Sequence, residues 1–375
     1  MGHLAMANGV YVELARRLDR FPIGAPPSKQ LYEILKILYS EEEAQVAAQF
    51  PMGRVTFEQL QERVKMEPAK LRAILESLAE KALIIDIPRG DKTFYILMPG
   101  FIGFFEFTFM RLQSDLPLKK LAHLMHDYMH HGGMGQEFFA SHTRRARTFV
   151  VESAVSHFGP QVLPYERASE VIREARYGAL TTCYCRHKAR HRGTACTAPL
   201  KDICTVLGTA AEFLVRRGYA RKADAAEMLD VLDMTEELGL CHLGDNVQER
   251  VGFICHCCRC CCELLAGYNK LGIRHPVAPS NFVSFVDQTK CTGCKTCLKR
   301  CPVRAISLET ITVDGRKEQR ARVDESICLG CGLCNAVCWV DALTMRRRKE
   351  PVITPATFRE QQMLIAAEKG KLSTG

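Results

Sequence analysis

Apolar residues in the first hundred positions repeat with the spacing of amphipathic helices. A first helix is predicted where one face collects Leu31, Ile34, Leu35 and Leu38. A second begins at Thr56, because a threonine followed three residues later by Gln59 forms a capping box. A third begins after Glu67, with Pro68 as its first residue and an apolar face made by Leu71, Ile74, Leu75 and Leu78.

Two strand-like runs follow, at residues 83–87 and 93–97, with a Pro-Arg-Gly-Asp turn between them. Three helices followed by a β-hairpin resemble a winged-helix domain, a fold that often binds DNA. The predicted recognition helix carries Glu76 and Glu80 beside its basic residues, and these carboxylates repel phosphate. We therefore expect residues 1–110, which include an N-terminal helix, to dock a partner protein and not nucleic acid.

The apolar run at residues 93–110 contains five phenylalanines between Phe101 and Phe109. Pro99, Gly100 and Glu106 interrupt it, and the chain has no longer apolar run, so no transmembrane helix is predicted. We expect this run to form a buried strand or to pack between domains. A docking surface is the alternative.

Residues 111–180 are expected to form a helical connector, which ends in a helix at 164–178. Four histidines lie close together in it: His123, His126, His130 and His131. A metal site is one interpretation, but the segment lacks an HExxH-type motif. We interpret these histidines as solvated or partner-facing.

Two cysteine strings near the C-terminus match position for position at an offset of 37 residues. Three closely spaced cysteines fit three corners of an iron–sulfur cubane, and the fourth cysteine of each string ligates the other cubane. This predicts one cluster on Cys291, Cys294, Cys297 and Cys338. It predicts a second on Cys328, Cys331, Cys334 and Cys301. Zinc sites usually bring two close pairs with a longer gap, and disulfides do not need this spacing, so the strings favour iron–sulfur clusters.

The two strings resemble a bacterial-type ferredoxin with two 4Fe–4S clusters, and the resemblance implies a ferredoxin domain at residues 276–346. Trp339 stands where the first string has Pro302, a departure that affects the turn and the potential of one cluster. Residues 347–375 begin with basic residues and predict a helix. We expect this C-terminal tail to be a partner-binding arm or to be solvated.

Residues 181–275 hold another concentration of cysteines, and we expect them to form a mostly helical domain with a helical stretch at 206–240. No core needs so many thiols, and six cysteines within eight residues suit a polynuclear cluster better than zinc. One or two further 4Fe–4S clusters are predicted, on ligands drawn from Cys183, Cys185, Cys196, Cys204, Cys255, Cys257, Cys258, Cys260, Cys261 and Cys262. One candidate set is Cys183, Cys185, Cys196 and Cys204, with help or exchange from the cysteines of residues 255–262. Cys241 is isolated and is interpreted as a bystander.

Arg186 and His187 lie beside the first of these cysteines, where they would raise a cluster's potential or compensate thiolate charge. The adjacent thiols in 257–262 resemble the paired cysteines of heterodisulfide-reductase-type noncubane clusters, but that family's longer spacing is absent. Residues 150–345 together resemble the multi-cluster ferredoxin-like proteins of strict anaerobes. The resemblance implies electron transfer within a larger redox complex.

Composition adds two constraints. The chain has 19 cysteines and no long apolar run after Met1, so we expect no secretory signal and thiols kept reduced in the cytoplasm. The formal net charge of +9 does not indicate nucleic-acid binding, because each oxidised cubane with its thiolates carries about two negative charges. Basic residues beside the first string would also steer an acidic redox partner.

The sequence therefore predicts an α+β protein with a winged-helix-like N-terminal domain, a cysteine-rich middle domain and a C-terminal bacterial dicluster ferredoxin fold. The favoured function is the relay of single electrons through 4Fe–4S clusters, between a low-potential donor and a redox enzyme partner. No nucleotide, flavin or hydrolase motif indicates a stand-alone enzyme. Two alternatives stay open: a redox-sensing winged-helix regulator, and a reductase subunit acting on a disulfide or corrinoid partner through the middle domain.

Overall fold

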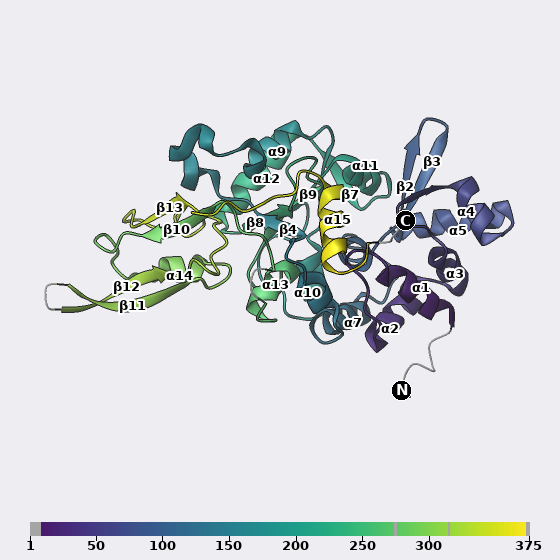
Figure 1. The fold of residues 1–375 in the computed structure, drawn as a ribbon, viewed down its shortest axis with the longest axis horizontal. Helices are drawn as coiled ribbons and strands as arrows, with labels where there is room; N and C mark the ends of the chain where they lie inside the picture. Colours follow the sequence, from purple (N-terminus) through teal and green to yellow (C-terminus); the bar gives the residue numbers. More distant parts are fainter. Residues whose placement is uncertain (1–8, 274–275, 314–315, 373–375) are drawn as a thin grey trace.

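Three units follow one another along the long axis of the molecule (Figure 1). The computed structural model describes residues 9–273, 276–313 and 316–372. Helices dominate the N-terminal end, a six-stranded sheet lies in the centre, and two β-ribbons form the other end. Residues 1–8, part of the stretch on which the expectation of no secretory signal rests, lie outside the described residues. No described helix is long and apolar enough to cross a bilayer.

The N-terminal unit packs helices against a small antiparallel sheet of order β1-β3-β2. Its helices are α1 (Gly9–Asp19), α2 (Lys29–Leu38), α3 (Glu41–Ala48), α4 (Phe57–Val64) and α5 (Pro68–Glu80). Its strands are β1 (Arg54–Thr56), β2 (Ile84–Arg89) and β3 (Lys92–Leu97). The predicted helices and hairpin are therefore present, while their assignment as a winged helix stays a prediction.

The predicted helix starts are confirmed because local capping chemistry decides them. The backbone N–H of Thr56 donates to the side chain of Gln59 at 3.0 Å, which completes the expected capping box of α4. Glu67 caps α5 through two backbone N–H groups. Helix α3 was not predicted, although Ser40 and Glu43 form a further capping box that would have identified it.

Six antiparallel strands form the central sheet, in the order β4-β8-β9-β6-β5-β7. They are β4 (Ala146–Thr148), β5 (Gly178–Thr181), β6 (Cys204–Leu207), β7 (Ala220–Ala223), β8 (Cys241–Asp245) and β9 (Phe253–Cys257). The helices that accompany it are α9 (Ala168–Glu174), α10 (Tyr184–His191), α11 (Gly208–Arg216), α12 (Ala225–Glu237) and α13 (Glu263–Asn269).

The expectation of a mostly helical middle domain overlooked its sheet, although helices hold more of residues 181–273 than strands do. Residues 111–180, expected as a helical connector, supply strands β4 and β5 to the central sheet, and the expected helical stretch 206–240 is broken by β7. Strands β5, β6 and β8 are only four or five residues long and buried throughout. They therefore lack the alternation of polar and apolar residues by which a strand is found in a sequence.

The phenylalanine-rich run packs between the N-terminal unit and the central sheet. It forms an irregular turn, Gly100–Phe104, in which Phe101, Ile102 and Gly103 lack helical backbone angles, followed by α6 (Phe105–Thr108). Phe105 contacts Tyr128, and Phe107 faces both Phe213 and Tyr219. The prediction of packing between domains is therefore confirmed, with an irregular turn and a short helix in place of a strand. The remaining segments are α7 (Leu118–His130), α8 (Met134–Phe139) and the 3₁₀ segments Glu152–Gln161 and Pro164–Glu166.

The C-terminal unit consists of two antiparallel ribbons, β10 with β13 and β11 with β12. Its elements are β10 (Phe282–Val286), α14 (Thr296–Arg300), β11 (Ile306–Val313), β12 (Arg316–Val323) and β13 (Leu343–Arg347). Each ribbon pairs a strand from the first cysteine repeat with one from the second. The two halves of the repeat are therefore interlocked.

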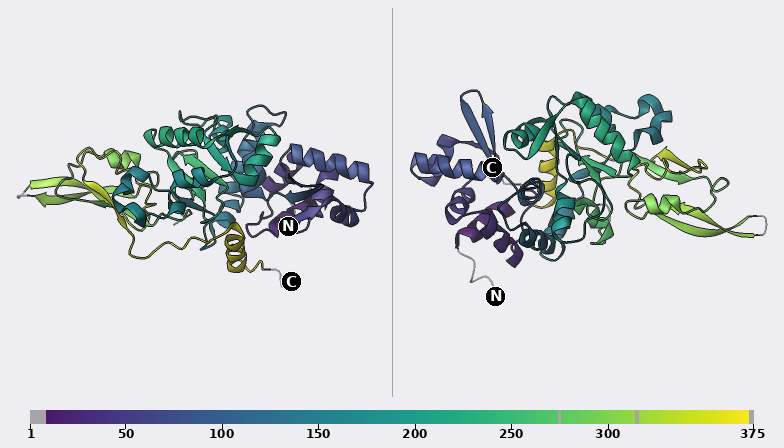
Figure 2. Two further views of the ribbon diagram at one scale, coloured as in Figure 1. Left: turned by 90° about the horizontal axis from the view of Figure 1, so that it is seen from above. Right: turned by 180° about the vertical axis from the view of Figure 1, so that it is seen from behind.

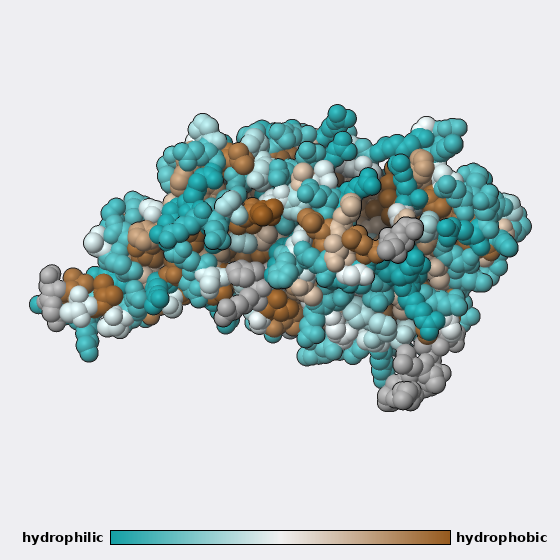
Figure 3. All heavy atoms as spheres, viewed as in Figure 1, coloured by the Kyte–Doolittle hydropathy of each residue, from teal (hydrophilic) through white to brown (hydrophobic). Residues whose placement is uncertain are grey.

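The expected solvated C-terminal tail instead returns across the central sheet as α15 (Phe358–Glu368), as Figures 1 and 2 show. Gln361 is fully buried, and its Nε2 donates to the backbone oxygens of Arg144 at 3.2 Å and Asn246 at 3.0 Å. These bonds hold the helix against the strand ends. Phe358 and Met363 stay about half exposed, and Figure 3 shows apolar groups of this kind scattered over a mainly polar face.

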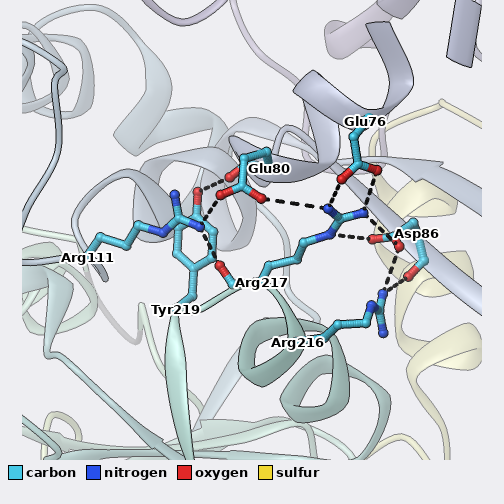
Figure 4. A network of polar contacts seen from close by, with 7 residues as sticks. All are labelled: Glu76, Glu80, Asp86, Arg111, Arg216, Arg217 and Tyr219. Carbon is cyan, nitrogen blue, oxygen red and sulfur yellow. Dashed lines mark hydrogen bonds and ion pairs between the residues drawn. The ribbon is translucent and has the colours of Figure 1, made fainter. Parts of the chain in front are cut away.

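A charged network joins the N-terminal unit to the central sheet (Figure 4). Arg217, which follows α11, pairs with Glu76 of α5 and with Asp86 of β2, the latter at 3.0 Å. Arg216 adds a second contact to Asp86 at 2.9 Å. Burial raises the pKa of Asp86, but the two guanidinium groups outweigh it and the net pKa is lowered. Acidic side chains expected to repel DNA are thus paired with arginines of the same chain.

We predict that Arg217→Ala loosens this junction. The side chains of Arg217 and Asp86 are 12% and 10% exposed, so the substitution leaves a nearly buried carboxylate with one partner fewer. The expected loss of unfolding free energy is about 2 kcal/mol, which corresponds to a fall of about 2–3 °C in the Tm of a 375-residue chain under air-free conditions.

Arg221→Ala is the matched control, because Arg221 is half exposed and its loss is expected to cost no more than about 0.5 kcal/mol. Since the folded pKa of Asp86 is lowered, the stabilisation is present above its unfolded pKa and is lost as pH falls through the folded pKa. The difference in Tm between Arg217→Ala and the unsubstituted protein should therefore become smaller in acid. If these two proteins had equal Tm values at neutral pH, the prediction would be contradicted.

Candidate metal centres

All 19 cysteines are free thiols, and they gather into four groups with Cys241 between two of them. Two groups lie in the C-terminal unit and two around the central sheet. Most of these thiols are buried. A buried thiolate is costly unless a cation or several N–H donors compensate its charge, so the groups match the requirements of metal centres.

The second C-terminal group lines a small enclosed cavity. Its walls include Cys301, Cys328, Cys331 and Cys334. Burial raises the pKa of Cys301, and the charges of Cys331 and Cys328 raise it further, which places Cys301 beside the second string. This is the grouping that cross-ligation requires. The ligand assignment itself stays a prediction.

The first C-terminal group lies nearer to solvent. Cys291 and Cys297 are buried, Cys338 is partly buried and Cys294 is exposed. Hydrogen bonds from Thr296 and from Trp339 lower the pKa of Cys294. Trp339 is 72% exposed, so the residue that departs from the first string lies at the open side of this group.

The fourth cysteine of each string accepts the same kind of backbone hydrogen bond. The backbone N–H of Ala305 donates to Cys301 Sγ at 3.2 Å, and that of Ala342 donates to Cys338 Sγ at 3.3 Å. Hydrogen bonds to cluster sulfurs help to set reduction potentials. Each fourth cysteine is therefore held in the same way, which supports equivalent roles for Cys301 and Cys338.

A group of four thiols in the middle of the chain could hold a further cluster. Cys196, Cys258, Cys260 and Cys261 place their sulfur atoms within 4.8 Å of one another. Hydrogen bonds from Cys261 and the nearby charge of Arg186 lower the pKa of Cys258 to about 4, although burial opposes them. Thiolates are the metal-binding form of cysteine.

A larger group of thiols lies on the other side of Arg186. Successive interactions link its members into a ring, from Cys183 through Cys204, Cys255, Cys257 and Cys262 to Cys185. The sulfur atoms of Cys262 and Cys257 are 3.2 Å apart. This six-thiol group holds two more thiols than one cubane uses.

Strand register and helix starts assemble the six-thiol group. Antiparallel pairing of β6 with β9 brings Cys204 next to Cys255. Cys255 and Cys257 point to one side of β9, because side chains alternate along a strand. Cys183 and Cys262 stand at the starts of α10 and α13, where free N–H groups favour negative charge.

The candidate set of Cys183, Cys185, Cys196 and Cys204 is therefore wrong for Cys196, which lies in the four-thiol group instead. Cys241 is not isolated either. It is fully buried and shares a hydrogen bond with Cys331, which raises the pKa of Cys241 and lowers that of Cys331. The nearby charge of Cys262 also raises the pKa of Cys241. Cys241 therefore lies between the six-thiol group and the second C-terminal group.

Arg186 and His187, both predicted to act on a middle-domain cluster, have different surroundings in the structure. Arg186 is 2% exposed and interacts with Cys183, Cys204 and Cys258, so it lies between the two middle groups. His187 instead places Nδ1 at 2.8 Å from the backbone oxygen of Phe109 and Nε2 at 3.2 Å from His191. No contact described for His187 involves a thiol.

We predict that Cys301→Ala releases iron from the set of Cys328, Cys331 and Cys334, because Cys301 shares their cavity. Iron should fall by about four per chain. Iodoacetamide labelling of air-free protein, followed by peptide mass spectrometry, should find these three thiols newly reactive. Cys338→Ala is the matched variant and should expose Cys291, Cys294 and Cys297. The opposite labelling would contradict cross-ligation.

We predict that Arg186→Met lowers the reduction potentials of the middle groups, because it removes a buried positive charge beside both. The expected shift is on the order of 60 mV, or about 1.4 kcal/mol for one electron. An EPR-monitored redox titration measures it. Arg190→Met, at an exposed position on the same helix, should leave the potentials unchanged. Equal potentials in the two variants would count against this role of Arg186.

Comparison with known proteins assigns one part of the chain to a family. A search of the curated proteins found no match. Residues 284–345 match the family model of the 4Fe-4S dicluster domain. This range contains both cysteine strings and the enclosed cavity. Residues 284–345 are therefore a 4Fe–4S dicluster domain, a module that carries two clusters and transfers electrons.

Proposed function

We propose that the chain relays single electrons between its dicluster domain and the two thiol groups of its central unit. The observation that carries this proposal is the order of the groups. Cys241 lies between the second C-terminal group and the six-thiol group, and Arg186 lies between the six-thiol group and the four-thiol group. Iron–sulfur cores bound at such positions supply stepwise one-electron exchange.

The two ends of this row are its most exposed parts. Cys294 is exposed at one end and Cys260 at the other, while the thiols between them are largely buried. Burial in the middle excludes water, and exposure at the ends permits a partner to approach. This distribution supports a relay with an entrance and an exit.

The charge around Cys294 supports an acidic partner at that end. Lys290, Lys295 and Lys299 are exposed there. Complementary charge raises the rate of encounter and orients the partner. The proposal therefore includes a redox protein partner with an acidic surface, in a larger complex in the cytoplasm of an anaerobe.

The N-terminal unit supports docking and not gene regulation. Glu76 and Asp86 are held by Arg217, and Glu80 pairs with Arg111 at 2.9 Å. Pairing of its acidic side chains with arginines of the same chain suits this unit to contacts within the protein better than to the major groove of DNA. We assign to it the role of a rigid platform beside the relay.

A reductase is the second candidate function, and the six-thiol group is the observation that favours it. Six thiols can hold a core larger than one cubane. Such a core would act on a disulfide or corrinoid partner directly. EPR of partly reduced protein separates the two functions, because ordinary reduced cubanes alone would support the relay.

Counting iron and sulfide on protein purified without air tests the relay. Four cubanes give about 16 irons per chain, whereas loading of the dicluster domain alone gives about eight. A redox titration should then show the middle groups accepting electrons from a reduced ferredoxin-type donor. About eight irons, or zinc in the middle groups, would overturn the proposal. A gel shift with reductant-dependent DNA binding would favour the regulator instead.

A further inference from the structure

Two imidazoles and a carboxylate from distant parts of the sequence converge beside the six-thiol group. His126 and His130 lie one turn apart on α7, with ring centroids 4.1 Å apart. Glu263 begins α13, immediately after Cys262. Nδ1 or Nε2 of each histidine and an oxygen of Glu263 all lie within 4.8 Å of one another. For this pair, the expectation of solvated or partner-facing histidines is thus replaced by a partly buried cluster.

Each of the three side chains has one buried polar atom without a hydrogen-bond partner in the part of the chain that the structure describes. These atoms are Nδ1 of His126, Nε2 of His130 and Oε2 of Glu263. The side chains of His130 and Glu263 are 6% and 3% exposed, and Nε2 and Oε2 are 3.6 Å apart, beyond hydrogen-bond length. Buried polar atoms without partners are rare and costly, so three of them in one cluster require an explanation.

The other oxygen of Glu263 is already occupied. Lys188 of α10 donates from Nζ to Oε1, and its side chain is 4% exposed. This pair fixes the carboxylate in its ionised form and turns Oε2 towards the histidines. Glu263 also adjoins the six-thiol group, because its backbone N–H donates to Cys185 Sγ at 3.5 Å.

We propose that His126, His130 and Glu263 bind one mononuclear divalent transition-metal ion, of the zinc or ferrous class. Two imidazole nitrogens and one carboxylate oxygen are a ligand set typical of both ions. One ion satisfies all three unpartnered atoms together. Metal–ligand bonds of about 2.0–2.2 Å need only small rotations of side chains that already stand within 4.8 Å. Three protein ligands leave at least one coordination position open.

Solvent comes within one helical turn of this site. His123, which precedes His126 by three residues on α7, lines an open hollow of about 940 Å³ together with His191. The site would thus place a Lewis-acidic ion beside the six-thiol group and one helical turn from this solvent-exposed hollow.

Zinc binding to the full chain, purified without air and with its clusters intact, tests the site. Zinc binds such ligands more tightly than ferrous iron, so it reports the site whichever ion is native. After dialysis against Zn²⁺, the protein should hold one tightly bound zinc per chain. X-ray absorption at the zinc edge should show nitrogen and oxygen at about 2.0–2.1 Å and no sulfur at about 2.3 Å.

His126→Ala/His130→Ala should abolish this zinc while leaving the iron content unchanged. His123→Ala/His131→Ala is the matched control, because His123 is exposed on α7 and His131 is exposed directly after its end, and it should bind zinc as the unsubstituted protein does. Should the first variant lose iron or fold poorly, Glu263→Gln replaces it and should weaken zinc binding at least about tenfold. Undiminished zinc in these variants, sulfur around the zinc, or no zinc in the unsubstituted protein would each overturn the proposal.

Discussion

The burial of many ionisable sulfur atoms is the constraint on which the rest of this structure depends. In an apolar interior a thiolate needs a compensating cation or several N–H donors. The fold supplies donors from backbone groups such as Ala305 and Ala342, and the buried cation Arg186. Metal cores would provide the remaining positive charge. The short strands and short helices of the central unit are arranged around this need.

The apolar core and the charged network act together to hold the three units in one orientation. A continuous set of buried residues runs from the N-terminal helices through α7 to the thiol groups. Arg217 ties α5 and β2 to the sheet, and α15 closes over its strand ends through Gln361. An N-terminal unit anchored in this way is suited to a fixed platform. It is poorly suited to the swinging motion that a DNA-binding switch would need.

Local signals explain why the C-terminal part was predictable. The two cysteine strings carry their ligand spacing within a few residues, and their tight loops need no distant partner. The helix starts at Thr56 and Glu67 were equally local. Helix α3 carried the same signal at Ser40. In each case a side chain satisfies backbone groups two or three residues away, so the chemistry can be recognised without knowing the fold.

The number and spacing of the cysteines indicate thiols gathered for metal, because they leave few other uses for so many. Which thiols stand together depends on how distant segments pack. Antiparallel register brings Cys204 to Cys255 and moves Cys196 to the other side of Arg186. Packing of α7 against α10, and the start of α13, carry His126 to Glu263. Such neighbours are set by strand pairing and helix packing between distant segments, and no local pattern in the chain encodes them.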